Sequence, residues 1–172
     1  LLPQLENYYV YVIARNIKKK KKMYNLDVSN IEELEKILAT SFDIIINCIG
    51  ILNKDAEENP HKAVWFNGYF PHLLVSLTKN TKTKVISIST DCVFSGKTGG
   101  YTESDVKDGE GFYSTSKAIG EINNEKDLTI RTSIIGPELN KEGIGLFHWF
   151  MGQKHEINGY SHAFWSGIST IE

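Results

Sequence analysis

Three apolar runs, each followed by a segment with helical spacing, constrain the fold of this chain more than any other feature. They span residues 43–49 (DIIINCI), 84–89 (KVISIS) and 128–133 (LTIRTS). The first of these runs is apolar almost without interruption, which predicts a strand buried on both faces, as in parallel sheets. Alternation of strands with helices predicts right-handed crossovers. The expected fold is therefore α/β, a doubly wound, Rossmann-like parallel sheet with ligands beyond the carboxyl ends of its strands.

Weaker signals complete this pattern. Two shorter strands are expected at 9–14 and 23–28. Ser29 and Glu32 have the spacing of a capping box and predict a helix start. A second helix is expected from residue 66 to 77, with Pro71 either kinking it or near its first turn. Further helices are expected at 112–123 and 144–151.

The length of 172 residues suggests one main domain. Residues 1–140 are predicted to form a dinucleotide-binding domain that lacks its first strand and glycine-rich loop. Residues 141–172 are predicted to begin a small C-terminal substrate domain. Residues 1–8 have the pattern of a helix end, so the chain is interpreted as a fragment of a longer protein.

Composition argues against several classes of function. A net charge of −2 gives no signal for nucleic acid, and the five lysines at 18–22 are interpreted as a solvated loop. No run reaches the roughly 20 apolar residues of a membrane span, and no signal peptide is visible, so a cytoplasmic location is expected. Cys48 and Cys92 are expected to be reduced thiols. The five histidines lack metal-ligand spacing, so no metal is predicted.

Tyr113 and Lys117 are the residues with the clearest chemical potential. Four positions apart on an expected helix, they share one face. A nearby ammonium is expected to lower the pKa of the phenol, and such a tyrosine can exchange a proton with a carbonyl or alcohol oxygen. The spacing alone is more often that of a surface pair. Thr90 strengthens the catalytic interpretation, because it ends an apolar strand where the sheet meets its ligand.

A family resemblance joins these residues. Residues 89–96 (STDCVFSG), 101–105 (YTESD) and 113–121 (YSTSKAIGE) resemble, in order and spacing, the extended short-chain dehydrogenase/reductase family. Within that family, the dTDP-4-dehydrorhamnose reductase group is most similar. The resemblance implies that Tyr113 is the general acid, that Lys117 binds the nicotinamide ribose and lowers the tyrosine pKa, and that Thr90 orients a keto sugar. It also implies a nucleotide-sugar substrate and, as a possibility, a homodimer.

The resemblance further implies hydride transfer from NADPH or NADH. Arg15 follows the strand expected at 9–14, which corresponds to the second strand of the family. A basic residue at this position favours NADPH, because it can pair with the 2′-phosphate. Each cofactor position also has a plain structural alternative, such as a surface arginine or a turn. The expected cofactor-binding residues, besides Tyr113 and Lys117, are Arg15, Asn16, Asp27, Val28, Cys48, Ile49, Gly50, Asn67 and Ser89.

One departure from the family concerns the phosphates of the cofactor. The glycine-rich G-x-x-G-x-x-G loop, which places backbone amides against the pyrophosphate, does not occur in residues 1–172. The pair Gly99–Gly100 lies in the loop before Tyr113 and is no substitute. The aromatics of 147–149 and 164–165 are interpreted first as core and second as a stacking surface for the substrate.

Two other functions remain open. Epimerases of the same family share the Tyr/Lys pair and keep NAD bound, and dehydratases need an acid just after the threonine, a place that Asp91 occupies. A non-catalytic nucleotide-binding module is the third hypothesis, although the retained Thr90, Tyr113 and Lys117 argue against it.

Overall fold

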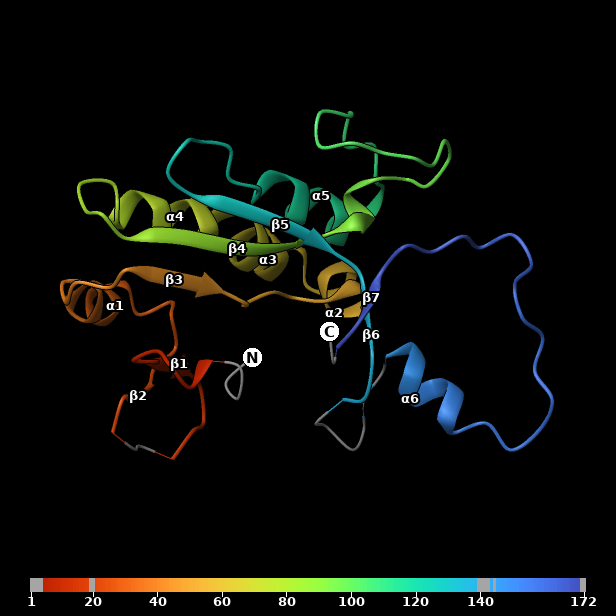
Figure 1. Cartoon of the computed structure of the whole chain (residues 1–172), viewed down its shortest axis with the longest axis horizontal. Helices are drawn as coiled ribbons and strands as arrows, with labels where there is room; N and C mark the ends of the chain where they lie inside the picture. Colours follow the sequence, from red (N-terminus) through yellow and green to blue (C-terminus); the bar gives the residue numbers. More distant parts are fainter. Residues whose placement is uncertain (1–4, 19–20, 139–142, 144, 171–172) are drawn as a thin grey trace.

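The computed structural model describes residues 5–18, 21–138, 143 and 145–170, and its strands pair in parallel throughout (Figure 1). Strand β1 (Val12–Ala14) pairs with β2 (Met23–Asn25). A second sheet has the order β3-β4-β5, from Ile44–Asn47, Lys84–Thr90 and Leu128–Thr132. The predicted α/β fold with parallel sheets is thus confirmed, although four of these five strands are shorter than the apolar runs.

Helix α1 (Ile31–Leu38) begins one residue later than the capping box predicts. Asn30 is the N-cap, and its Oδ1 accepts a hydrogen bond from the Glu33 amide at 3.3 Å. Ser29 instead donates its amide and hydroxyl to Asp27 Oδ1, at 3.0 and 2.8 Å. The prediction failed because serine and asparagine are equally good N-caps and the Asp27 turn engages the serine.

The second predicted helix is longer than expected and changes its winding midway. It runs through α3 (Pro60–Ala63), a π-helical turn η2 (Val64–Tyr69) and α4 (Phe70–Leu77), preceded by the short α2 (Asn53–Glu58). Pro71 has no amide hydrogen, and its ring would collide with the carbonyl of residue 67 in a regular α-helix. The wider π turn just before it avoids that collision.

Helix α5 (Gly111–Ile119) packs closely against this turn. A Cβ atom on Gly120 would overlap the carbonyl oxygen of Asn67, and one on Gly68 would lie 3.6 Å from the Ser116 carbonyl. Gly120 therefore allows the backbones of α5 and η2 to approach, whereas a side-chain methyl at Gly68 would fit. This contact places Asn67 beside the helix that bears Tyr113.

The hydrophobic core lies on one face of the β3-β4-β5 sheet. Helices α1 and α4 bury Leu34, Phe70 and Leu74 against Val85 of β4, which has 0% exposure. On the other face Ile44, Ile46, Leu128 and Ile130 are 40–50% exposed. Burial on both faces, which the apolar run 43–49 predicted, is therefore wrong for β3, because no helix among the described residues covers this second face (Figure 1).

The last part of the chain contains only short elements among the described residues, and its helix α6 (Leu146–Met151) buries no side chain. Strand β6 (Ile134–Ile135) pairs with β7 (Ile168–Ser169), and α6 lies between them in sequence. The boundary expected at residue 140 falls outside the described residues, as do residues 1–4 of the expected helix end; Leu5–Tyr8 form a turn. Across the described part of the chain, no helix is long and apolar enough to cross a membrane.

Candidate active site

The structure brings Thr90 and Tyr113 together at the carboxyl end of β4. Thr90 is the last residue of the strand and is buried, and its hydroxyl accepts a hydrogen bond from the Cys92 amide at 3.2 Å. The side chain of Tyr113, on the first turn of α5, lies close enough to that of Thr90 for the threonine hydroxyl to lower the pKa of the phenol. Two hydroxyls therefore meet at the edge of the sheet where ligands of such folds bind.

The direction of the Tyr113 pKa shift differs from the expectation. Burial raises the pKa of the phenol, the Thr90 hydroxyl lowers it, and the net shift is upward. The expected lowering by Lys117 is wrong for this structure, because the Lys117 ammonium faces elsewhere. Its Nζ donates to the carbonyl oxygen of Ile88 at 2.7 Å. Tyr113 is thus a protonated phenol at neutral pH, the form that a proton donor needs.

Lys117 connects the tyrosine helix with the loop after β3. A Cβ atom on Gly50 would lie 3.7 Å from Lys117 Nζ and 3.3 Å from Asn67 Oδ1, so a glycine leaves room in front of the ammonium. Burial lowers the pKa of Lys117, while the charges of Glu121 and Cys48 act in the opposite direction.

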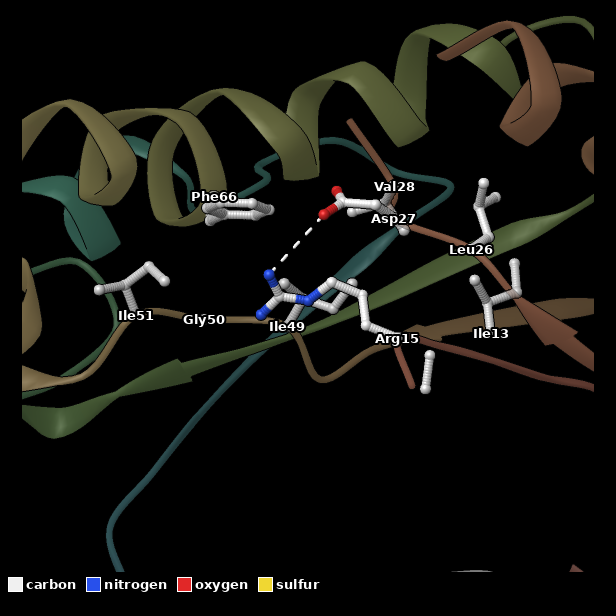
Figure 2. Close-up of a pocket in the computed structure, with 10 residues that line it drawn as sticks. Ile13, Arg15, Leu26, Asp27, Val28, Ile49, Gly50, Ile51 and Phe66 are labelled. Carbon is white, nitrogen blue, oxygen red and sulfur yellow. Dashed lines mark ion pairs between the residues drawn. The ribbon is translucent and has the colours of Figure 1, made fainter. Parts of the chain in front are cut away.

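A pocket of about 190 Å³ begins at this glycine (Figure 2). Five of the eleven expected cofactor-binding residues line it, and they come from three separate segments. Apolar side chains complete the wall, from Ile13, Ala14, Leu26, Ile51 and Phe66. The expected residues that line the pocket are Arg15, Asp27, Val28, Ile49 and Gly50.

Arg15 and Asp27 face each other in this pocket (Figure 2). Arg15 Nη1 lies 3.7 Å from Asp27 Oδ2, and both side chains are largely exposed, at 67% and 45%. Hydrogen bonds from the amide and hydroxyl of Ser29 lower the pKa of Asp27. The turn that Ser29 and Asp27 form is the structural alternative weighed for Asp27. The guanidinium remains accessible to an anion.

Six expected cofactor-binding residues do not line this pocket. Asn16 occupies the turn after β1 with a positive φ of 57°. Cys48 is an exposed free thiol. Ser89 donates its hydroxyl to Glu121 at 2.9 Å, so a role in cofactor binding would fall to its backbone. The others are Asn67, Tyr113 and Lys117.

Asn67 and Asn47 hold the loop at 48–51 in place. Asn67 accepts from the Ile51 amide at 2.8 Å and donates to the Ile51 carbonyl at 2.9 Å. It also donates to Ser116 Oγ of α5 at 3.0 Å. Asn47, buried at the end of β3, accepts from the Ile49 amide at 3.1 Å. Asn67 was expected to steady this region, whereas Asn47 was missed although it is a polar residue in an apolar run.

Glu121 forms a buried ionic network that the sequence interpretation overlooked. It accepts from Arg131 Nε and Nη2 at 2.8 and 2.7 Å, and it pairs with Lys107 Nζ at 2.8 Å. Burial acts to raise its pKa, but hydrogen bonds from Arg131, Lys107 and Ser89 lower it to about 2. An arginine in the apolar strand 128–133 was the available signal, because such a charge needs a partner.

The C-terminal aromatics are not core. Phe147, Trp149, Phe164 and Trp165 are all exposed, and Trp165 Nε1 donates to Ser133 Oγ at 2.7 Å. Their interpretation as core is wrong for the described residues, and the stacking surface stays a prediction. No group of three or more potential metal ligands occurs in the part of the chain that the structure describes.

Comparison with known proteins identifies the family to which the chain belongs. The family described as RmlD substrate binding domain matches residues 3–156, which is most of the chain. The chain belongs to this family. A probable low-salt glycan biosynthesis reductase, Agl14 of Haloferax volcanii, is 32% identical over 102 residues, covering 58% of this chain and 34% of the relative.

Solved structures agree with this assignment. A hypothetical dTDP-4-dehydrorhamnose reductase from Sulfolobus tokodaii is 30% identical with a TM-score of 0.69, over 80% of this chain and 52% of that one. The dTDP-4-dehydrorhamnose reductase of Bacillus anthracis, solved in complex with NADP, is 24% identical with a TM-score of 0.63, over 76% and 55% of the two chains. The chain thus spans about half the length of these structures and a third of the curated relative.

Proposed function

We propose that this chain is the catalytic part of an oxidoreductase that reduces the 4-keto group of a nucleotide-linked deoxysugar with NADPH. The proposal rests above all on the proximity of the Thr90 and Tyr113 side chains at the carboxyl end of β4. Membership of a family with sugar-nucleotide reductases supports the substrate class. A cytoplasmic location and a homodimer remain predictions.

In this mechanism Tyr113 donates its proton to the C4 oxygen of the sugar. The raised pKa of the phenol keeps that proton available at neutral pH. Thr90 orients the same oxygen through its hydroxyl, and Lys117 holds a ribose hydroxyl. Bound NADPH would supply the hydride.

The residues of the pocket suit a nicotinamide dinucleotide. Apolar walls from Leu26, Val28 and Phe66 fit a flat ring, and the exposed Arg15 guanidinium fits a 2′-phosphate. Gly50 lets a ligand approach Lys117 closely. Asn16, Asp27, Cys48, Ile49, Asn67 and Ser89 are proposed to contribute through the backbone or by holding the loops that frame the cofactor.

Turnover by matched variants tests the proposal. The purified full-length protein should oxidise NADPH, measured as a loss of absorbance, when it receives a dTDP-4-keto-6-deoxysugar. Tyr113→Phe should lower kcat by about 100-fold or more, since general acid catalysis contributes about that much. Tyr69→Phe, on an exposed tyrosine whose ring faces Trp65, should leave the rate unchanged. Equal rates for Tyr113→Phe and the wild type would refute the proposed role.

The same assay separates the alternatives. Sugar isomerisation or dehydration without net consumption of NADPH would identify an epimerase or dehydratase, for which Asp91 is the candidate acid. Its Oδ1 accepts from the Thr90 hydroxyl at 3.3 Å, so it stands close to the site. Quenching of tryptophan fluorescence by NADPH, with no turnover of any nucleotide sugar, would favour a binding module.

A further inference from the structure

The first turn of α5 is completed by a side chain from another helix. The first amides of an α-helix lack partners within the helix, and the N-cap side chain normally supplies one. Here the N-cap, Glu110, makes no such bond. Instead the amide of Tyr113 donates to Glu57 Oε1 at 3.2 Å, from a residue 56 positions earlier in the chain.

Gly111 makes this contact possible. Its φ of +85° is a conformation that favours glycine. A Cβ atom at this position would stand 2.7 Å from Glu57 Oε1. The glycine therefore leaves the space that the carboxylate occupies. A negative charge there is also favourable, because the amino end of a helix carries partial positive charge.

Glu57 belongs to the segment that follows the expected cofactor loop. Helix α2 begins at Asn53, three residues after Gly50, and it packs on α5. Asn67 fixes the start of this connection by binding the amide and carbonyl of Ile51, and it reaches Ser116 of α5. The loop and α5 are thus joined at two points. Asn67 contacts the middle of α5 at Ser116, and Glu57 contacts its first turn at Tyr113.

We propose that Glu57 is a positioning residue that couples occupancy of the loop at 48–51 to the placement of Tyr113. Its carboxylate holds the backbone of the tyrosine itself, so a shift of the loop and α2 is transmitted to the phenol. This inference deepens the proposed reductase function and rests on it, but the coupling has a physical readout that needs no turnover.

Four proteins test the coupling: the wild type, Glu57→Ala, Glu57→Gln and the matched control Glu58→Ala. Glu58 is on the same helix, and its only described ion pair is with the exposed Lys54. Hydrogen exchange of the Tyr113 amide is measured with and without NADPH. NADPH should slow this exchange in the wild type, Glu57→Gln and Glu58→Ala, because each retains an acceptor at position 57, but not in Glu57→Ala.

Kinetics supply the second readout. Glu57→Ala should lower kcat by about 10-fold or more, since small misplacements of a catalytic group are costly, while its Kd for NADPH stays within about twofold of the wild type. Glu57→Gln should restore most of kcat. Protection of the Tyr113 amide by NADPH in Glu57→Ala, or equal losses in Glu57→Ala and Glu58→Ala, would overturn the inference. Absence of turnover in the wild type would instead refute the proposed function and leave the exchange test intact.

Discussion

Tyr113 shows how burial and a neighbour compete to set the state of one side chain. Burial favours the neutral phenol, and the Thr90 hydroxyl only partly opposes it. Lys117, expected to pull the pKa down, instead donates to the Ile88 carbonyl. A ribose hydroxyl in front of Gly50 could compete for that ammonium. Burial therefore keeps the phenol in its protonated form.

Arg15 permits a prediction about the choice of cofactor. Arg15→Ala should raise the KM for NADPH by about 10-fold, the value of one hydrogen bond to a charged group, and leave the KM for NADH unchanged. The reason is that only NADPH carries the 2′-phosphate. Steady-state kinetics with both cofactors would check this, with the exposed Lys62→Ala as a control of equal charge. Equal changes for both cofactors would place Arg15 elsewhere than at the phosphate.

At the scale of elements, Glu121 ties α5 to its surroundings. Ser89 comes from β4, Arg131 from β5 and Lys107 from the loop before α5. The Arg131 guanidinium also lies 4.9 Å from the centre of the Phe94 ring, which stacks on Tyr101. This loop, with its Y-x-E-x-D block, is thereby fastened beside Thr90 and Tyr113.

The network predicts a pH-dependent loss of stability. The pKa of Glu121 falls from 4.5 to about 2 on folding, so the unfolded state binds more protons between these values. Its contribution is complete above pH 4.5 and declines as the pH falls toward 2. Glu121→Gln should cost about 3 kcal/mol of unfolding free energy at pH 7, and the gap to the wild type should narrow over that range.

Urea unfolding at several pH values would measure this gap. Glu58→Gln is a suitable control, because its pair with Lys54, 3.8 Å long, is exposed at both ends and should contribute less than about 1 kcal/mol. A gap that stays constant from pH 7 to pH 2 would show that the charge of Glu121 is not what stabilises the protein.

The sequence predicted the elements and the central residues because their signals are local. The apolar runs located β3, β4 and β5, and the motif spacing located Thr90, Tyr113 and Lys117. It failed where the answer depends on tertiary contacts. Glu57 and Glu121 are ordinary acidic residues until the fold brings Tyr113 and Arg131 to them, and Ser89 points to Glu121 because α5 ends beside β4. The prediction of burial on both faces failed because an apolar run shows that a strand can be buried, but not whether a helix covers each face of its sheet.

At the scale of the whole molecule, the two faces of the β3-β4-β5 sheet should differ in how much a substitution on each changes the free energy of unfolding. Ile130 is 40% exposed on that face, whereas Val85 has 0% exposure on the other. Ile130→Thr should change the unfolding free energy by less than about 0.5 kcal/mol and weaken binding of a hydrophobic dye. Val85→Thr should cost about 1–3 kcal/mol, because it buries a hydroxyl. Similar costs for both, measured by urea unfolding, would mean that a further layer covers the Ile130 face.

The division of the strands into two sheets has a consequence for ligand binding. Among the described residues, the ladder of β1 and β2 does not continue into β3, so this pair is joined to the rest through side chains such as Leu26 and Val28. Arg15 and Gly50 line one pocket from the two sides of this division. A ligand bound there would therefore contact both parts of the molecule and stabilise their association.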